Sequence, residues 1–134
     1  MVDALTADVS EVSRRDRTTQ TLTLDAGPTH AGQEFVILGT MSGTLPGFDH
    51  GGWRIPINPD LYTAILVFQP QLSPIAPLHG YLDGSGKATA TFELVRRWRS
   101  APVVGRTFHH VVLLLDGHGE IAFVSNAVPV TVRP

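Results

Sequence analysis

The sequence predicts an all-β fold, an antiparallel β-sandwich of Greek-key or immunoglobulin-like type with about eight or nine strands. Hydrophobic and polar residues alternate with a period of two in several short segments, as they do in half-buried strands. The 13 glycines and 10 prolines among 134 residues mark many turns. No segment keeps the spacing of an amphipathic helix over three turns. A chain of this length forms one domain with a substantial core.

The main strands are expected where hydrophobic residues either alternate or run without interruption. Alternation marks residues 19–26 and 87–94 as strands with one buried face. Residues 34–40, 61–68 and 109–116 are apolar on both faces and rich in β-branched or aromatic side chains. This pattern predicts central strands that are covered on both sides.

The remaining segments are less regular. Residues 68–80 contain three prolines and are expected to form an irregular crossover. A single helical turn at residues 96–100 is the most helix that we expect. Residues 120–132 close the chain with further strand character.

Two segments, 82–92 and 115–124, share the pattern L-D-G-x-G followed by a strand. Both patterns predict hairpin turns in which a glycine takes a positive φ and the aspartate accepts hydrogen bonds from nearby backbone. We expect the positive φ at Gly84 and Gly117, so that valine at either position destabilises the fold.

The N-terminal residues 1–17 differ from the sandwich domain expected over 18–134. Residues 4–10 have strand character with little core pattern, which predicts an edge strand or an arm that docks on a neighbour. Lys87 is the only lysine, although lysines commonly protect exposed sheet edges. We therefore expect the chain to associate with itself, or with a parent protein, through a sheet edge or this segment.

Composition excludes several classes of partner. A net charge of -2 is too small to attract nucleic acid or anionic lipid over a distance. No apolar run reaches the length needed for membrane insertion, and the first residues lack the pattern of a signal peptide. The absence of cysteine removes disulfides and thiolate chemistry.

The motifs that carry enzyme chemistry are incomplete. The P-loop pattern fails because Tyr81 and Ala88 occupy the places of its first glycine and its hydroxyl residue. Ser42 is one place out of register for a nucleophile elbow. His109 and His110 should point to opposite faces of one strand and bind no shared metal. Each acidic turn supplies too few carboxylates for calcium, so we predict no catalytic residue, metal or cofactor.

Loop aromatics are the candidates for ligand binding. Phe48, His50, Trp53 and Arg54 lie together in the segment FDHGGWR and could stack on a sugar ring. Trp98, between arginines in RRWRS, forms a second candidate. The alternative for each tryptophan is a packing role over a sheet edge.

One series of motifs resembles a known family. D-A-G at 25–27, H-A-G at 30–32, G-T at 39–40, P-G at 46–47 and the late S-N-x-V-P at 125–129 are similar to a small β-sandwich module near the C-termini of secreted proteins of planctomycetes and similar bacteria. The resemblance implies a secreted accessory module without a common catalytic residue. The chain departs from that pattern at residues 11–20 and 95–100.

The glycine-rich stretch 24–47 is interpreted as a set of corners rather than a site, with His30 in a loop between two of them. The corners are expected at Gly27, Gly32, Gly39, Gly43 and Gly47.

These observations favour a non-catalytic structural or interaction module of an extracellular or cell-surface protein. Its partners would be a second copy or domains of the parent protein. The first alternative is a carbohydrate-binding module that uses the loop aromatics, with a polysaccharide as partner. The second alternative is a small hydrolase or metal-dependent enzyme.

Overall fold

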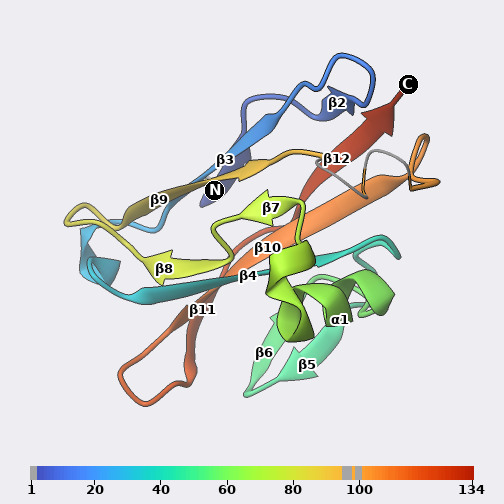
Figure 1. Ribbon diagram of the computed structural model, residues 1–134. Coiled ribbons are helices and arrows are strands. Elements are labelled where there is room, and N and C mark those ends of the chain that lie inside the picture. Colours follow the sequence, from blue (N-terminus) through green and yellow to red (C-terminus); the bar gives the residue numbers. More distant parts are fainter. Residues whose placement is uncertain (1–2, 95–97, 99–100) are drawn as a thin grey trace.

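Two β-sheets face each other in the computed structural model, which describes residues 3–94, 98 and 101–134 (Figure 1). The four-stranded sheet has the order β1 (Leu5–Ala7), β3 (Gln20–Asp25), β9 (Lys87–Phe92) and β7 (Ile75–Ala76). The six-stranded sheet has the order β2 (Glu11–Ser13), β12 (Val128–Arg133), β10 (Thr107–Leu115), β4 (Glu34–Thr40) and β8 (His79–Tyr81), with β11 (Ile121–Val124) also on β10.

Three further kinds of element lie outside these sheets. A hairpin is formed by β5 (Phe48–His50) and β6 (Trp53–Ile55). One α-helix, α1, spans Leu61–Phe68, and two short 3₁₀ helices span Pro28–His30 (η1) and Pro70–Leu72 (η2).

The strand order is that of an immunoglobulin-like Greek-key sandwich. The N-terminal segment contributes β1 to one sheet and then crosses to the other, where β2 pairs in parallel with β12. All other strand pairs are antiparallel. Leu5 and Val12 are both buried, so residues 5–13 form part of the sandwich. The predicted all-β sandwich is confirmed.

The core lies between the two sheets and follows the alternation in the sequence. Leu22 and Leu24 of β3 and Phe92 of β9 are buried against Phe108 and Leu114 of β10 in one hydrophobic cluster. The strands predicted over 19–26, 34–40, 87–94 and 109–116 therefore all form, with small differences at their ends.

The outer face of β10 has a separate cover. Val111 and Leu113 alternate with the core residues and pack with Ile55 and Ile57 in a second buried cluster. The β5–β6 hairpin and the residues after it form this cover, which explains why β10 is apolar on both faces.

The prediction of a central strand at 61–68 is wrong, because these residues form α1. The Asp60 carboxylate accepts a hydrogen bond from the backbone of Thr63 at 3.1 Å, and the Thr63 hydroxyl accepts one from the backbone of Asp60 at 3.1 Å. This capping box satisfies two donors at the helix start. Pro70 lies just beyond the last helical residue and prevents continuation.

The described residues form twelve strands, more than the eight or nine expected. Six of the twelve strands are only two or three residues long, too short to show alternation. The segment 68–80 holds η2, β7 and β8, and it carries the chain from the smaller sheet to the larger one. The helical turn expected at 96–100 lies outside the described residues except for Trp98.

The two predicted turns share one geometry, but only the second joins paired strands, β10 and β11. The strands on either side of the first turn, β8 and β9, belong to different sheets, so the prediction of a hairpin at 82–92 is wrong. Asp83 Oδ1 accepts hydrogen bonds from the backbone of Ser85 and Lys87 at 2.8 and 3.0 Å. Asp116 Oδ1 does the same in the second turn. The positive φ predicted at Gly84 and Gly117 is wrong, because the positive values occur two residues later in each turn.

The later glycines are Gly86 and Gly119, each with φ +78°. Each donates its N–H to the carbonyl of the turn's aspartate, at 3.0 and 3.1 Å. This is a type I turn followed by a left-handed residue, the usual form of hairpin loops of this length. The left-handed residue therefore ends the turn instead of beginning it.

Replacing Gly86 with alanine is expected to destabilise the fold by about 2 kcal/mol or more. Positive φ strains a residue with a side chain, and a Cβ at this position would lie 1.8 Å from the Gly27 carbonyl oxygen. Gly119→Ala should cost only about 1 kcal/mol, because it adds backbone strain without a clash. Urea unfolding measures both losses.

Gly84→Ala is the matched control in the same turn as Gly86. A Cβ at Gly84 meets nothing within 4 Å and its φ is not positive, so the free energy of unfolding should change by less than about 0.5 kcal/mol. Equal losses in Gly84→Ala and Gly86→Ala would show that the left-handed residue has been placed wrongly.

Candidate functional site

The four residues of the segment FDHGGWR that were predicted to bind a ligand lie on the β5–β6 hairpin. Phe48 packs against the cluster that covers the outer face of β10. The Trp53 indole N–H donates a hydrogen bond to the Ile121 carbonyl at 3.1 Å. His50 is exposed, and the exposed Arg54 guanidinium pairs with Asp49 at 2.5 Å. The hairpin thus brings four of the predicted residues together, but the Phe48 ring contributes to packing and the Trp53 indole N–H is already hydrogen-bonded.

Trp98 belongs to a different part of the molecule. Its indole N–H donates to the Leu72 carbonyl at 2.5 Å. Its ring meets Tyr62 edge-on, with centroids 5.6 Å apart, and Phe108 at 6.0 Å. Phe108 belongs to the core between the sheets, whereas Trp53 belongs to the hairpin over the outer face of β10. The two tryptophans do not form one site.

The histidine pair on β10 follows the predicted alternation. His110 is fully buried among Phe92 and Phe108, with ring centroids 5.5 and 6.4 Å from theirs, whereas His109 is only half-buried. Among the residues that the structure describes, no group of three His, Asp or Glu side chains could hold a metal ion.

His110 is hydrogen-bonded to α1 through Tyr62. The Tyr62 hydroxyl and His110 Nε2 lie 2.6 Å apart, and both side chains are buried. Burial, with a smaller contribution from the charge of the neighbouring His109, lowers the pKa of His110 to about 3. Burial also raises the pKa of Tyr62 well above its usual value, with a contribution from the charge of Asp60. The pair is therefore neutral at physiological pH and holds α1 to the sheet.

Gly39 makes this contact possible. A Cβ at Gly39 would lie 2.6 Å from Tyr62 Cε2 and 2.7 Å from His110 Cδ2. Gly39 is inside β4, so its prediction as a corner is wrong, and its role is to leave space for the two rings. The other four predicted corners, Gly27, Gly32, Gly43 and Gly47, all have positive φ.

A hydrogen-bond network fixes the start of α1. The Asp60 carboxylate accepts from the Met41 backbone at 2.9 Å and from the Ser42 hydroxyl at 2.6 Å. Burial acts to raise the pKa of Asp60, but the hydrogen bonds from Ser42, Met41 and Thr63 together lower it. The Thr63 hydroxyl also donates to the Gly39 carbonyl at 2.6 Å. The helix is therefore attached to β4 and to the loop after it.

The loop after β4 spans residues 41–47, and the Asn58 side chain fixes its backbone through hydrogen bonds. Its amide nitrogen donates to the carbonyls of Ser42 and Leu45 at 2.9 and 2.7 Å, and its oxygen accepts from the backbone of Gly47 at 2.9 Å. The Leu45 side chain is 84% exposed. The loop therefore presents a large apolar side chain from a fixed backbone.

The side of α1 that faces away from the sheet is apolar and exposed. The inner side chains Tyr62, Thr63 and Leu66 are buried, whereas Leu61 and Phe68 are 77% and 79% exposed. We define the outer face of α1 as Leu61, Ala64, Ile65 and Phe68, which recur at helical spacing. Val67, 50% exposed, flanks this face. The helix contains no charged residue, so its exposed side resembles a buried one in composition.

Sequence reasoning missed this face because α1 is apolar on all sides and lacks an amphipathic pattern. The signals that could have predicted the helix are local. Asp60 and Thr63 have the spacing of a capping box, and Pro70 follows the segment. Together they bracket an eight-residue helix.

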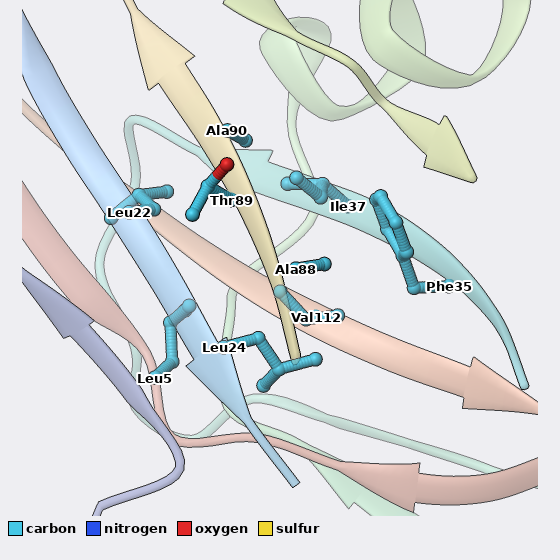
Figure 2. Close-up of a pocket in the computed structure, with 9 residues that line it drawn as sticks. All are labelled: Leu5, Leu22, Leu24, Phe35, Ile37, Ala88, Thr89, Ala90 and Val112. Atoms are coloured by element: carbon cyan, nitrogen blue, oxygen red, sulfur yellow. The ribbon is translucent and has the colours of Figure 1, made fainter. Parts of the chain in front are cut away.

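The space between the sheets offers no binding site. A gap of about 10 Å³ lies among nine residues of β1, β3, β4, β9 and β10. Figure 2 shows these residues as sticks. All but Thr89 are hydrophobic. A gap of this size and lining stays dry. It is a packing defect of the core rather than a pocket for a ligand.

No protein-family model matches the chain, and no curated protein is detectably similar to it. In the described part of the chain, no helix has the length and apolar character to cross a membrane.

The stability of the fold should depend on pH through His110. In the unfolded chain this histidine titrates near 6.5, whereas in the folded protein burial lowers its pKa to about 3. The unfolded state therefore binds a proton that the folded state excludes, and stability falls as pH falls from about 6.5 toward 3, by up to about 1.4 kcal/mol per pH unit. Above this range the contribution is constant.

Urea unfolding at neutral pH and near pH 5 tests this dependence. His110→Gln removes the titrating group and should flatten the profile relative to the unmodified chain. His109→Gln is the comparison: burial also lowers the pKa of the half-buried His109, so this variant should flatten the profile as well, but less than His110→Gln does. Identical pH profiles for the unmodified chain and His110→Gln would refute the role of His110.

Tyr62→Phe should destabilise the fold by about 1 to 3 kcal/mol, because it leaves a buried His110 nitrogen without its partner. Tyr81→Phe removes a hydroxyl from a tyrosine that is 67% exposed and should change stability little. Thermal and urea unfolding compare the two variants. Equal stability of Tyr62→Phe and the unmodified chain would contradict the proposed anchoring of α1.

Proposed function

We propose that this chain is a non-catalytic interaction module and that the outer face of α1 is its contact surface. The observation that supports this proposal is the exposure of Leu61 and Phe68 on an uncharged helix whose inner side is firmly attached. Exposed apolar groups clustered on a rigid element are typical of protein–protein contacts. The resemblance found in the sequence supports an accessory role in an extracellular or cell-surface protein of bacterial origin.

The energetics favour a covered state of this face. Burying one large apolar side chain contributes about 1.5 to 3 kcal/mol relative to leaving it in water. Leu61 and Phe68 each leave more than three quarters of their surface in water. A partner that covers both side chains therefore recovers free energy that the isolated chain does not.

The carbohydrate-binding alternative is less well supported. The Phe48 ring packs on the sheet, and the Trp53 indole N–H is already bonded to a backbone carbonyl. A hydrolytic role is also less well supported, because the closest contact between two titratable side chains in the core, Tyr62 with His110, is closed to solvent.

A photo-crosslinking amino acid at position 68 should form covalent adducts with a protein partner in the host where the sequence occurs. The reason is that Phe68 lies on the outer face of α1 and is 79% exposed. Mass spectrometry identifies the adducts. An adduct with any protein, a second copy included, supports the proposed function.

The same amino acid at position 49 is the control, since Asp49 is exposed on the β5–β6 hairpin, away from α1. Equal labelling at positions 68 and 49, or none at 68, would contradict the proposal. A glycan array with the unmodified chain and Trp53→Ala tests the alternative. Binding that Trp53→Ala abolishes would establish a carbohydrate-binding module instead.

A further inference from the structure

We infer that the outer face of α1 binds the same face of a second copy of this chain, with the two helices antiparallel across a two-fold axis. The inference rests on the proposed function, because it names the partner of that contact surface. It places the contact on the helix rather than on a sheet edge.

The spacing of side chains on α1 suits an antiparallel pair. Leu61 and Phe68 lie at the two ends of the helix, two turns apart on one side, and Ala64 lies between them. At 1.5 Å per residue the helix is about 12 Å long. An antiparallel partner places its Phe68 over Leu61, while the small Ala64 side chains allow the helices to approach where they cross. The face is therefore complementary to itself.

Charge favours the same partner. Residues 61–78 contain no Asp, Glu, Lys, Arg or His, so two such faces bury no unpaired charge when they meet. The net charge of -2 causes little repulsion between two copies. A partner surface with charged groups would have to desolvate them against a face that offers no counter-charge.

The distribution of exposed apolar residues favours a symmetric contact. Across the described ranges, the exposed large hydrophobic residues are Val9, Leu45, Leu61, Val67, Phe68, Tyr81 and Val104. Three of these seven lie on α1, and no other element carries more than one. A head-to-tail contact needs a second complementary patch on the molecule, whereas a two-fold contact needs only this one.

The sheet edges are poorer contact sites. The edge strands of the two main sheets are β1, β7, β2, β8 and β11, and each has only two to four residues. Short edge strands are a common means of preventing edge pairing. The α1 face is smaller than the roughly 800 Å² per partner of a standard interface, so we expect a reversible dimer that forms at micromolar or higher concentrations.

Sedimentation velocity from low micromolar to several hundred micromolar chain tests the inference. The unmodified chain should shift from monomer to dimer with concentration. Phe68→Glu should raise the dimer dissociation constant at least about tenfold, because it places a charge against the apolar Leu61 of the other copy. Tyr81→Glu is the matched control, since Tyr81 is also exposed but lies on β8. Circular dichroism verifies that each variant is folded.

A double variant identifies the arrangement. In Leu61→Lys with Phe68→Glu, the lysine of one copy faces the glutamate of the other only if the helices are antiparallel. This double variant should dimerise more tightly than either single variant. Failure of the double variant to exceed both single variants would overturn the antiparallel arrangement.

Three other outcomes would overturn the inference. They are a monomer throughout the concentration range, a dimer that Phe68→Glu leaves unchanged, and binding of the monomer to neutral phosphatidylcholine vesicles through Phe68. Adducts of position 68 with a different protein, from a chain that stays monomeric, would refute the second copy as partner but retain the proposed function.

Discussion

The contact between Tyr62 and His110 determines how the rest of this molecule is arranged around α1. The hydrogen bond of 2.6 Å joins a helix to the longest strand of the six-stranded sheet, and it lies in a fully buried position. Gly39 provides the space for both rings, and Phe108 packs edge-on against Tyr62 at 4.9 Å. Together with the hydrogen bond from the Thr63 hydroxyl to the Gly39 carbonyl, this contact orients the inner face of α1 on the sheet.

One consequence of that contact is the exposure of the opposite face. A helix that is apolar on all sides can bury only one side against a sandwich, so the attachment of Tyr62 and Leu66 leaves Leu61 and Phe68 in water. The network around Asp60 and Asn58 holds the helix start and the loop with Leu45 in place. The surface is therefore organised before any partner binds, which reduces the entropy lost on association.

The sequence predicted those parts of the fold that depend on local patterns. Alternation located β3 and β9, and length with β-branched composition located β4 and β10. The same reasoning misassigned α1, because a segment that is apolar on all sides has no period that separates helix from strand. It predicted both turns, but the turn after β8 leads into the other sheet instead of forming a hairpin, and the positive φ lies at the last glycine of each turn instead of the first.

Features that depend on distant residues could not be predicted. The role of Gly39 follows from two rings that belong to α1 and β10. The hydrogen bonds of Trp53 and Trp98 depend on carbonyls at Ile121 and Leu72, which are distant in sequence. The exposure of the α1 outer face likewise depends on which side of the helix Tyr62 attaches to the sheet. The segment has no periodic pattern from which that side could be predicted.

The most direct test of the central claim, that the attached helix presents a surface for contact with a second copy of the chain, is a dilution series followed by NMR. Methyl and aromatic resonances are recorded while the chain is diluted from several hundred micromolar to low micromolar. We expect shift changes to concentrate on Leu61, Ile65 and Phe68 and to leave the β5–β6 hairpin and the buried Tyr62 ring nearly unchanged. Shifts confined to β1 and β2, or constant spectra throughout the series, would contradict the claim.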